Sequence, residues 1–163
     1  MTKIRAVKSK DDCNAIAQLA NIIWREHYTP IIGIDQVSYM LDKFQSSEAI
    51  KQQIEDGYKY YAISYNMVLV GYLAIKKNDH TMFLSKIYIS KDFRGLGIGK
   101  TALNFIDQEA TNHACKTITL TVNRFNTNSI NAYEKLGYIK TRTAIKDIGE
   151  GYVMDDYIME RTL

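Results

Sequence analysis

The chain has 163 residues, of which 46% are hydrophobic and 24% charged, with a formal net charge of +3. This composition predicts one globular domain spanning 1–163, and the scattered lysines and arginines argue against nucleic-acid binding. No apolar run is long enough to span a bilayer, and the two cysteines, Cys13 and Cys115, imply no disulfide framework and hence a reducing, cytoplasmic location.

The first half of the chain predicts a strand, three amphipathic helices and a three-stranded β meander, in that order. These elements are the strand Ile4–Val7, a helix through Ile16 and Trp24, the helices Asp35–Phe44 and Glu48–Glu55, and the strands Tyr58–Tyr65, Met67–Lys76 and Met82–Ile89. Asp11 and Asp12 are expected to cap the first helix, and Tyr28-Thr29-Pro30 to end it. Ser46 or Ser47 is expected to cap the third.

The second half alternates helices and strands. The predicted elements are a helix from Ile98 to about His113, the strand Thr117–Val122, the helix Thr127–Leu136 and the closing strands Ile139–Ile145 and Gly151–Arg161. This order predicts an α/β (α+β) fold.

A glycine-rich segment, Arg94 to Thr101, joins the strand Met82–Ile89 to the following helix. A loop of this kind at a helix N-terminus directs several unpaired backbone N–H groups, and the positive end of the helix dipole, at one point. Such a point binds phosphate. The function therefore depends on which phosphate-bearing ligand the loop holds.

Spacing separates three interpretations of this loop. A nucleotide-hydrolase P-loop requires glycine where the chain has Arg94, and the strand Thr117–Val122 offers no aspartate for Mg²⁺. The dinucleotide fingerprint expects an acidic residue about 20 positions later, where the chain has Val122-Asn123-Arg124. The third pattern, [QR]-x-x-G-x-[GA], is matched by Arg94-Gly95-Leu96-Gly97-Ile98-Gly99.

This third pattern resembles the pyrophosphate-binding motif of the GNAT superfamily, the acetyl-CoA-dependent N-acetyltransferases. A second block, Asn126 to Tyr138, is similar to a later motif of the superfamily: an asparagine before a helix, a tyrosine within it and Gly-aromatic at its end. Both blocks occur in the expected order, each at a strand–helix junction. The chain is therefore expected to be an N-acetyltransferase.

The resemblance implies a single GNAT-like domain with a mixed, mostly antiparallel sheet of about seven strands, splayed between the fourth and fifth, and helices on both faces. Acetyl-CoA, the acetyl donor, would enter the splayed region, with its pantetheine arm beside the fourth strand and its pyrophosphate on the loop amides. The residues assigned to it are Ile87, Tyr88, Ile89, Arg94, Gly95, Leu96, Gly97, Ile98, Gly99, Lys100, Asn126, Tyr133 and Lys135. No metal site is expected, because the histidines and cysteines lack ligand spacing.

Amine acetylation needs a base for the acceptor and an acid for the departing thiolate. The resemblance assigns the acid to Tyr133. Related enzymes often carry a glutamate base at the position of Ser85, so here either a water relayed by Ser85 or a residue of the first helix, Glu26 or His27, is expected to take the proton.

The acceptor wall is expected from Trp24–Tyr39 and Gly149–Asp156, which combine aromatic and acidic side chains. The close of the chain, Met154 to Glu160, is loosely similar to the spermidine/spermine N-acetyltransferase branch. A small, polyamine-like primary amine is the expected acceptor. The alternatives are a lysine or N-terminal amine of a peptide, and a CoA-binding sensor without turnover. The superfamily also allows a homodimer through the last strands.

Overall fold

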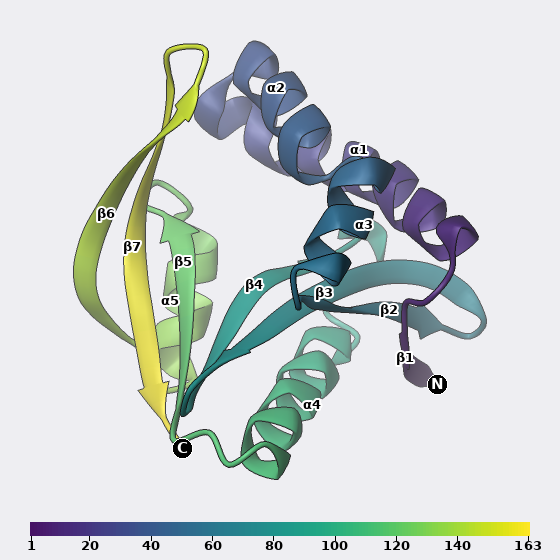
Figure 1. The fold of residues 1–163 in the computed structure, drawn as a ribbon, viewed down its shortest axis with the longest axis vertical. Coiled ribbons are helices and arrows are strands. Elements are labelled where there is room, and N and C mark those ends of the chain that lie inside the picture. Colours follow the sequence, from purple (N-terminus) through teal and green to yellow (C-terminus); the bar gives the residue numbers. More distant parts are fainter. The chain divides into compact units, whose positions relative to one another are not determined.

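The computed structural model describes all 163 residues. Five α-helices and seven strands follow one another in the order expected from the sequence (Figure 1). They are β1 Thr2–Ala6, α1 Lys10–Ile32, α2 Ile34–Phe44, α3 Ser47–Glu55, β2 Lys59–Tyr65, β3 Val68–Asn78, β4 Thr81–Ile89, α4 Ile98–Asn112, β5 Thr117–Asn123, α5 Thr127–Lys135, β6 Ile139–Gly149 and β7 Tyr152–Thr162.

The seven strands form a mixed sheet in the order β1-β2-β3-β4-β5-β7-β6. The pairs β1–β2, β2–β3, β5–β7 and β6–β7 are antiparallel. β4 and β5 are parallel, with registered pairs from Thr81↔Thr117 to Leu84↔Leu120. The predicted α/β fold with a mixed, mostly antiparallel sheet is confirmed.

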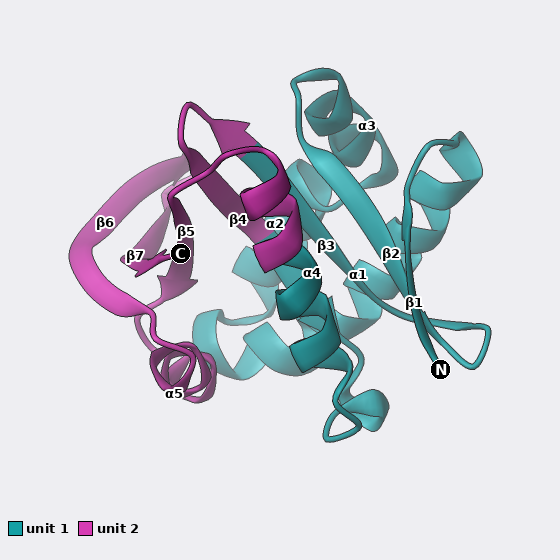
Figure 2. Cartoon of the chain, turned by 90° about the horizontal axis from the view of Figure 1, so that it is seen from below, with its two compact units in different colours: residues 1–76, 86–106 teal, residues 77–85, 107–163 magenta.

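The chain divides into two compact units (Figure 2). Unit 1 contains residues 1–76 and 86–106, and unit 2 contains 77–85 and 107–163. β3, β4 and α4 each pass from one unit into the other, so the division does not separate two continuous segments of sequence. The interpretation of 1–163 as one domain stays a prediction.

Unit 1 packs helices on both faces of the strands β1 to β4. Successive side chains of a strand point to opposite faces, and β2 shows both contacts. The Tyr60 hydroxyl donates a hydrogen bond to Gln53 of α3, whereas the Tyr61 ring lies 4.8 Å from the Phe105 ring of α4. In Figure 1, α1, α2 and α3 accordingly lie on one side of these strands and α4 on the other.

Two expectations about the first helix were wrong. Its N-cap is Ser9 rather than Asp11 or Asp12: the Ser9 hydroxyl accepts from the Asp12 amide, and the Asp12 carboxylate accepts from Ser9 in return. The helix also continues through Pro30 to Ile32. Proline has no N–H to donate, so the helix lacks one internal bond at Pro30. It continues for less than one turn and ends before Gly33, whose N–H bonds to Thr29 O.

Unit 2 contains the β5–β7–β6 strands, the start of β4, α5 and the last part of α4. β6 is longer than predicted: it continues past Ile145 to Gly149, and registered pairs with β7 extend to Gly149↔Tyr152. The end of β6 was predicted too early because Lys146 and Asp147 are charged, and charged residues occur in exposed strands as well as in turns. None of the helices combines the length and apolar character needed to cross a bilayer.

Candidate functional site

The glycine-rich loop of unit 1 has a backbone that only glycine adopts readily. After a 3₁₀ turn at Lys91–Phe93, Gly95 and Gly97 have φ of +80° and +79°. A Cβ atom at either position would meet no atom within 4 Å. The need for glycine is therefore conformational rather than steric.

This backbone leaves a row of amides without acceptors. The first helical bond of α4 runs from Thr101 N to Gly97 O, so the N–H groups of Ile98, Gly99 and Lys100 are the unpaired groups of a helix N-terminus. The amides of Gly95, Leu96 and Gly97 donate no hydrogen bond within the chain either. With a 15-residue helix behind them, these six N–H groups form a site suited to a diphosphate.

Arg94 differs from the six residues that follow it. Its amide donates to Lys91 O at 3.3 Å, and its side-chain Nε donates to Ile89 O at 3.2 Å. Its side chain therefore ties the loop to the end of β4. Within unit 1, β4 is the last strand of the order β1-β2-β3-β4, so the main chain around Ile87 and Ile89 lies at the edge of this unit's sheet. An edge strand can pair with an extended ligand.

Gly71 lets the end of β4 lie close to the backbone of β3. A Cβ atom built on Gly71 would lie 2.5 Å from Tyr88 O and 3.4 Å from the Ile89 Cα. Backbone atoms cannot swing aside as a flexible side chain can. Any side chain at Gly71 therefore displaces the strand end that leads into the loop.

Gly71→Ala is expected to lower the free energy of unfolding by about 1–3 kcal/mol, because it overpacks two backbones. Urea unfolding measures the change. The matched control is Gly99→Ala in α4, whose added methyl group would lie 3.5 Å from Ile89 Cδ1, an ordinary contact, and which gains helix propensity. Equal stability of the two variants would contradict the role given to Gly71.

Unit 2 holds four further residues that the sequence assigned to the donor or to catalysis. Asn126 is the N-cap residue of α5 and is 4% exposed, but its side chain makes no capping hydrogen bond. Tyr133, on α5, is half-buried, with its ring 5.6 Å from that of Tyr138. Lys135 is exposed at the end of the helix, and Ser85 is half-buried on β4.

The base candidates on α1 lie in unit 1. Glu26 is exposed, and the half-buried His27 ring packs edge-on against Tyr28 at 4.7 Å. Tyr28 also belongs to an aromatic cluster with Trp24 and Tyr88, in which ring centroids lie 4.4 to 6.3 Å apart. Two aromatic residues of the predicted acceptor wall, Trp24 and Tyr28, thus pack against Tyr88 of β4, which was predicted to contact the donor.

The sequence placed Asp156 in the predicted acceptor wall but did not show that its side chain is buried. Asp156 of β7 is 7% exposed, and burial, followed by the neighbouring Asp155, raises its pKa to about 6. The sequence shows only two adjacent acids. Neighbours on a strand face opposite sides, but only the register shows which one is buried. No three His, Cys, Asp or Glu side chains lie close enough together to bind a metal ion.

Comparison with known protein families adds the decisive observation. The family model described as the acetyltransferase (GNAT) family matches residues 16–138, which include the glycine-rich loop and α5. The chain belongs to this family. The GNAT enzyme is an N-acetyltransferase, and acetyl-CoA is its acetyl donor.

Solved structures agree with the GNAT fold over the whole length of the chain. The PaiA N-acetyltransferase from Thermoplasma acidophilum, solved in complex with coenzyme A, is 20% identical with a TM-score of 0.80, over 100% of this chain and 99% of that one. A GCN5-related N-acetyltransferase from Rhodopseudomonas palustris is 15% identical with a TM-score of 0.84, over 100% and 96%. The ribosomal-protein-S18-alanine N-acetyltransferase from Escherichia coli is 16% identical with a TM-score of 0.71, over 99% and 94%.

The diphosphate of coenzyme A fits the amides described above. The GNAT enzyme offers six unpaired N–H groups, and glycines allow a ligand to approach the backbone closely. Lys100, the last of the six, is exposed and would add a positive side chain. A diphosphate at this loop would therefore meet mainly main-chain donors.

Proposed function

We propose that this GNAT enzyme transfers the acetyl group of acetyl-CoA to a small, polyamine-like primary amine by direct attack, with Tyr133 as the general acid. The observation that supports binding of the acetyl donor is the row of six unpaired amides from Gly95 to Lys100. No side-chain nucleophile is needed to carry the acetyl group, because the amine itself attacks the thioester.

The acid is needed because the thiolate of coenzyme A leaves. A C–N bond forms, the C–S bond breaks, and the proton on the Tyr133 hydroxyl passes to the sulfur. The half-buried position of Tyr133 on α5 supports this role. Its ring packs against Tyr138, and part of the residue stays exposed to solvent. Ser85, half-buried on β4, remains the candidate for relaying a water.

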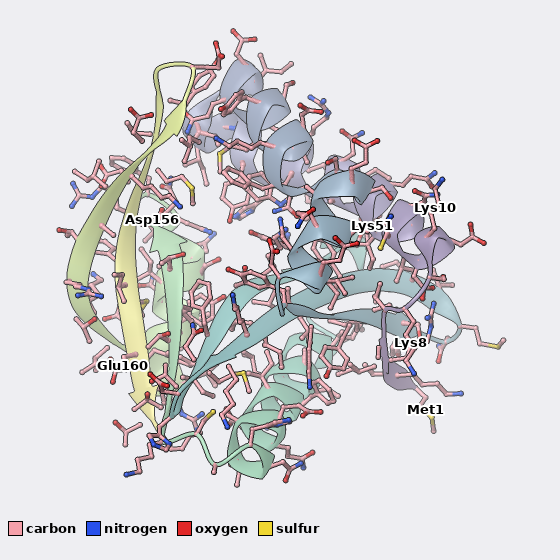
Figure 3. The ribbon with its side chains drawn as sticks, in the orientation of Figure 1. Met1, Lys8, Lys10, Lys51, Asp156 and Glu160 are labelled. Carbon is pink, nitrogen blue, oxygen red and sulfur yellow. The ribbon has the colours of Figure 1, made fainter.

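Aromatic side chains in unit 1 and acidic side chains in unit 2 each support a cationic acceptor. Unit 1 supplies the cluster of Trp24, Tyr28 and Tyr88, and aromatic faces attract ammonium groups. Unit 2 supplies two acids on β7, Asp156 and Glu160 (Figure 3). The cytoplasm is the proposed location, because both cysteines are free and buried.

The test is thiol release from acetyl-CoA in the presence of matched acceptors: spermidine, spermine, 1,4-diaminobutane, n-butylamine, and a peptide with a free N-terminus and one lysine. The proposal predicts that kcat/KM is highest for the amines with two or more charges. A preference for the peptide would favour the peptide acetyltransferase, and the absence of thiol release with every acceptor would favour a CoA-binding sensor. A homodimer stays a prediction.

A further inference from the structure

Asp156 is a buried carboxylate with no partner. It lies on β7 between Asn123 of β5 and Ala144 of β6 in the strand register. It is 7% exposed, its carboxyl group makes no hydrogen bond or ion pair within the chain, and its oxygens are not among the side-chain atoms fully closed off from solvent. A carboxylate that has little solvent and no protein partner is poorly stabilised in its charged form. A carboxylate in such surroundings is a candidate functional group.

The register shows which face of the unit 2 sheet carries Asp156. Its neighbour Asp155 faces the other way and pairs with Arg124 at 3.4 Å. Arg161, on the same face as Asp155, pairs with Asp107 of α4 at 2.6 Å and approaches the end of α5 at Gly137. The helices of unit 2 therefore cover the Asp155 face, and Asp156 lies on the opposite face.

That opposite face contains a cavity of about 460 Å³. Its lining combines three threonines, two charged and three apolar side chains: Phe83, Thr119, Leu120, Thr121, Thr141, Arg142, Ile158 and Glu160. Ile158 is two residues from Asp156 on the same strand, and Thr121, opposite Ile158, is likewise two residues from Asn123. Because side chains two apart share a face, Asp156 lies on the same face as this cavity, two residues along β7 from its lining residue Ile158.

The charged groups on this face leave Asp156 unpaired. By register, β6 contributes Arg142 and Lys146, and β7 contributes Glu160, four residues along the strand. β5 contributes Thr121 and Asn123, which do not titrate. Neither Arg142 nor Lys146 forms an ion pair with Asp156. A cationic ligand group would therefore meet a free carboxylate.

We propose that Asp156 binds the acceptor amine and takes its proton, with the rest of the acceptor lying in the adjacent cavity. The attacking amino group reacts in its neutral form: its nitrogen forms a bond to the acetyl carbon, the C–S bond breaks, and one N–H proton passes to an Asp156 oxygen. The Tyr133 proton passes to the thiolate sulfur, and solvent then returns the proton from Asp156 to the Tyr133 phenolate, which restores both groups. This inference rests on the proposed function, and it assigns the base to β7 rather than to Ser85, Glu26 or His27.

The test compares Asp156→Asn and Asp156→Glu with the wild type, using whichever acceptor of the panel gives the highest kcat/KM. Asp156→Asn is expected to lower kcat/KM about 100-fold, the usual scale for removing a general base. The wild type should show an acidic limb near pH 6 that Asp156→Asn lacks, because only the carboxylate accepts a proton. Asp156→Glu should restore part of the rate.

Two further measurements separate catalysis from folding. Asp156→Asn is expected to be at least as stable as the wild type at pH 7 in urea, because it removes a buried charge, and to keep wild-type affinity for coenzyme A. Glu134→Gln, on an exposed acid of α5, removes one charge from the same unit and should leave the pH profile unchanged.

The outcomes distinguish this inference from the proposed function. Thiol release by the wild type, together with an Asp156→Asn variant that keeps the rate and the limb near pH 6, would overturn only the role of Asp156. An equal loss of rate and of coenzyme A affinity would also overturn it, because the carboxylate would then serve the donor site or the fold. A wild type without turnover on any amine would overturn both.

Discussion

Replacing Tyr133 with phenylalanine is expected to lower kcat about 100-fold, the scale of a lost general acid. A tyrosine of pKa near 10 that protonates a thiolate of pKa near 8.5 works uphill by about 1.5 units, roughly 2 kcal/mol, which is small beside the cost of expelling a free thiolate. Because phenylalanine has no proton to give, the loss of kcat is expected at every pH at which the wild type turns over. Steady-state thiol release from pH 6 to 10.5 measures this loss.

The matched control is Tyr138→Phe, which removes a hydroxyl from the ring that packs against Tyr133. Tyr138 is buried, and burial, followed by the charge of Asp107, raises its pKa to about 12. This control should keep kcat within about twofold of the wild type while losing some stability, as is usual for a buried hydrogen bond. If Tyr133→Phe kept full kcat at every pH, Tyr133 would be a packing residue only.

The second large effect concerns the stability of unit 1. Lys86 of β4 is 7% exposed, and its Nζ donates to Phe44 O at 2.6 Å, to Gln53 Oε1 at 3.1 Å and to the Tyr60 hydroxyl. Phe44 is the last residue of α2, so the lysine ties a helix C-terminus to the sheet. No carboxylate pairs with it, and burial lowers its pKa from 10.5 to about 7.

This lowered pKa makes unfolding depend on pH. Between about pH 7 and 10.5 the unfolded lysine holds a proton that the folded one has released, so stability rises with pH by about 1.4 kcal/mol per unit across that window. Relative to Lys86→Met, the wild type is expected to gain about 3 kcal/mol of unfolding free energy between pH 7 and 9.5. Urea unfolding at several pH values measures it.

Lys51→Met on α3 is the control for the Lys86 variant, because it makes the same substitution at an exposed position (Figure 3). The difference in unfolding free energy between Lys51→Met and the wild type should stay constant across the pH range. If the difference between Lys86→Met and the wild type also stayed constant, the buried lysine would not change its protonation on folding.

The order of helices and strands could be predicted from the sequence because apolar periodicity and turn residues act locally. The glycine loop was also predictable, since a positive φ at Gly95 and Gly97 restricts the residue type directly. Helix ends were less certain. Pro30 reads as a stop, but it lies one turn before Gly33, where the loss of one hydrogen bond is tolerated.

Pairwise relations across the sheet could not be predicted. Lys86 reads as an exposed charge in a strand, and nothing local shows that Phe44 O and Gln53 lie above it. Asp155 and Asp156 read as equal acids, yet the β5–β7 register gives one of them an arginine partner and leaves the other buried. In both cases the deciding contacts join residues that are distant in the sequence.

The central claim is that main-chain amides of the loop hold the diphosphate of coenzyme A. Titration of the ¹⁵N-labelled enzyme with coenzyme A, followed by amide chemical shifts, tests it at the atoms concerned. The largest downfield proton shifts are expected at the amides from Gly95 to Lys100, and pantetheine, which lacks the diphosphate, should not produce them. Coenzyme A binding that leaves these six amides unshifted would contradict the account.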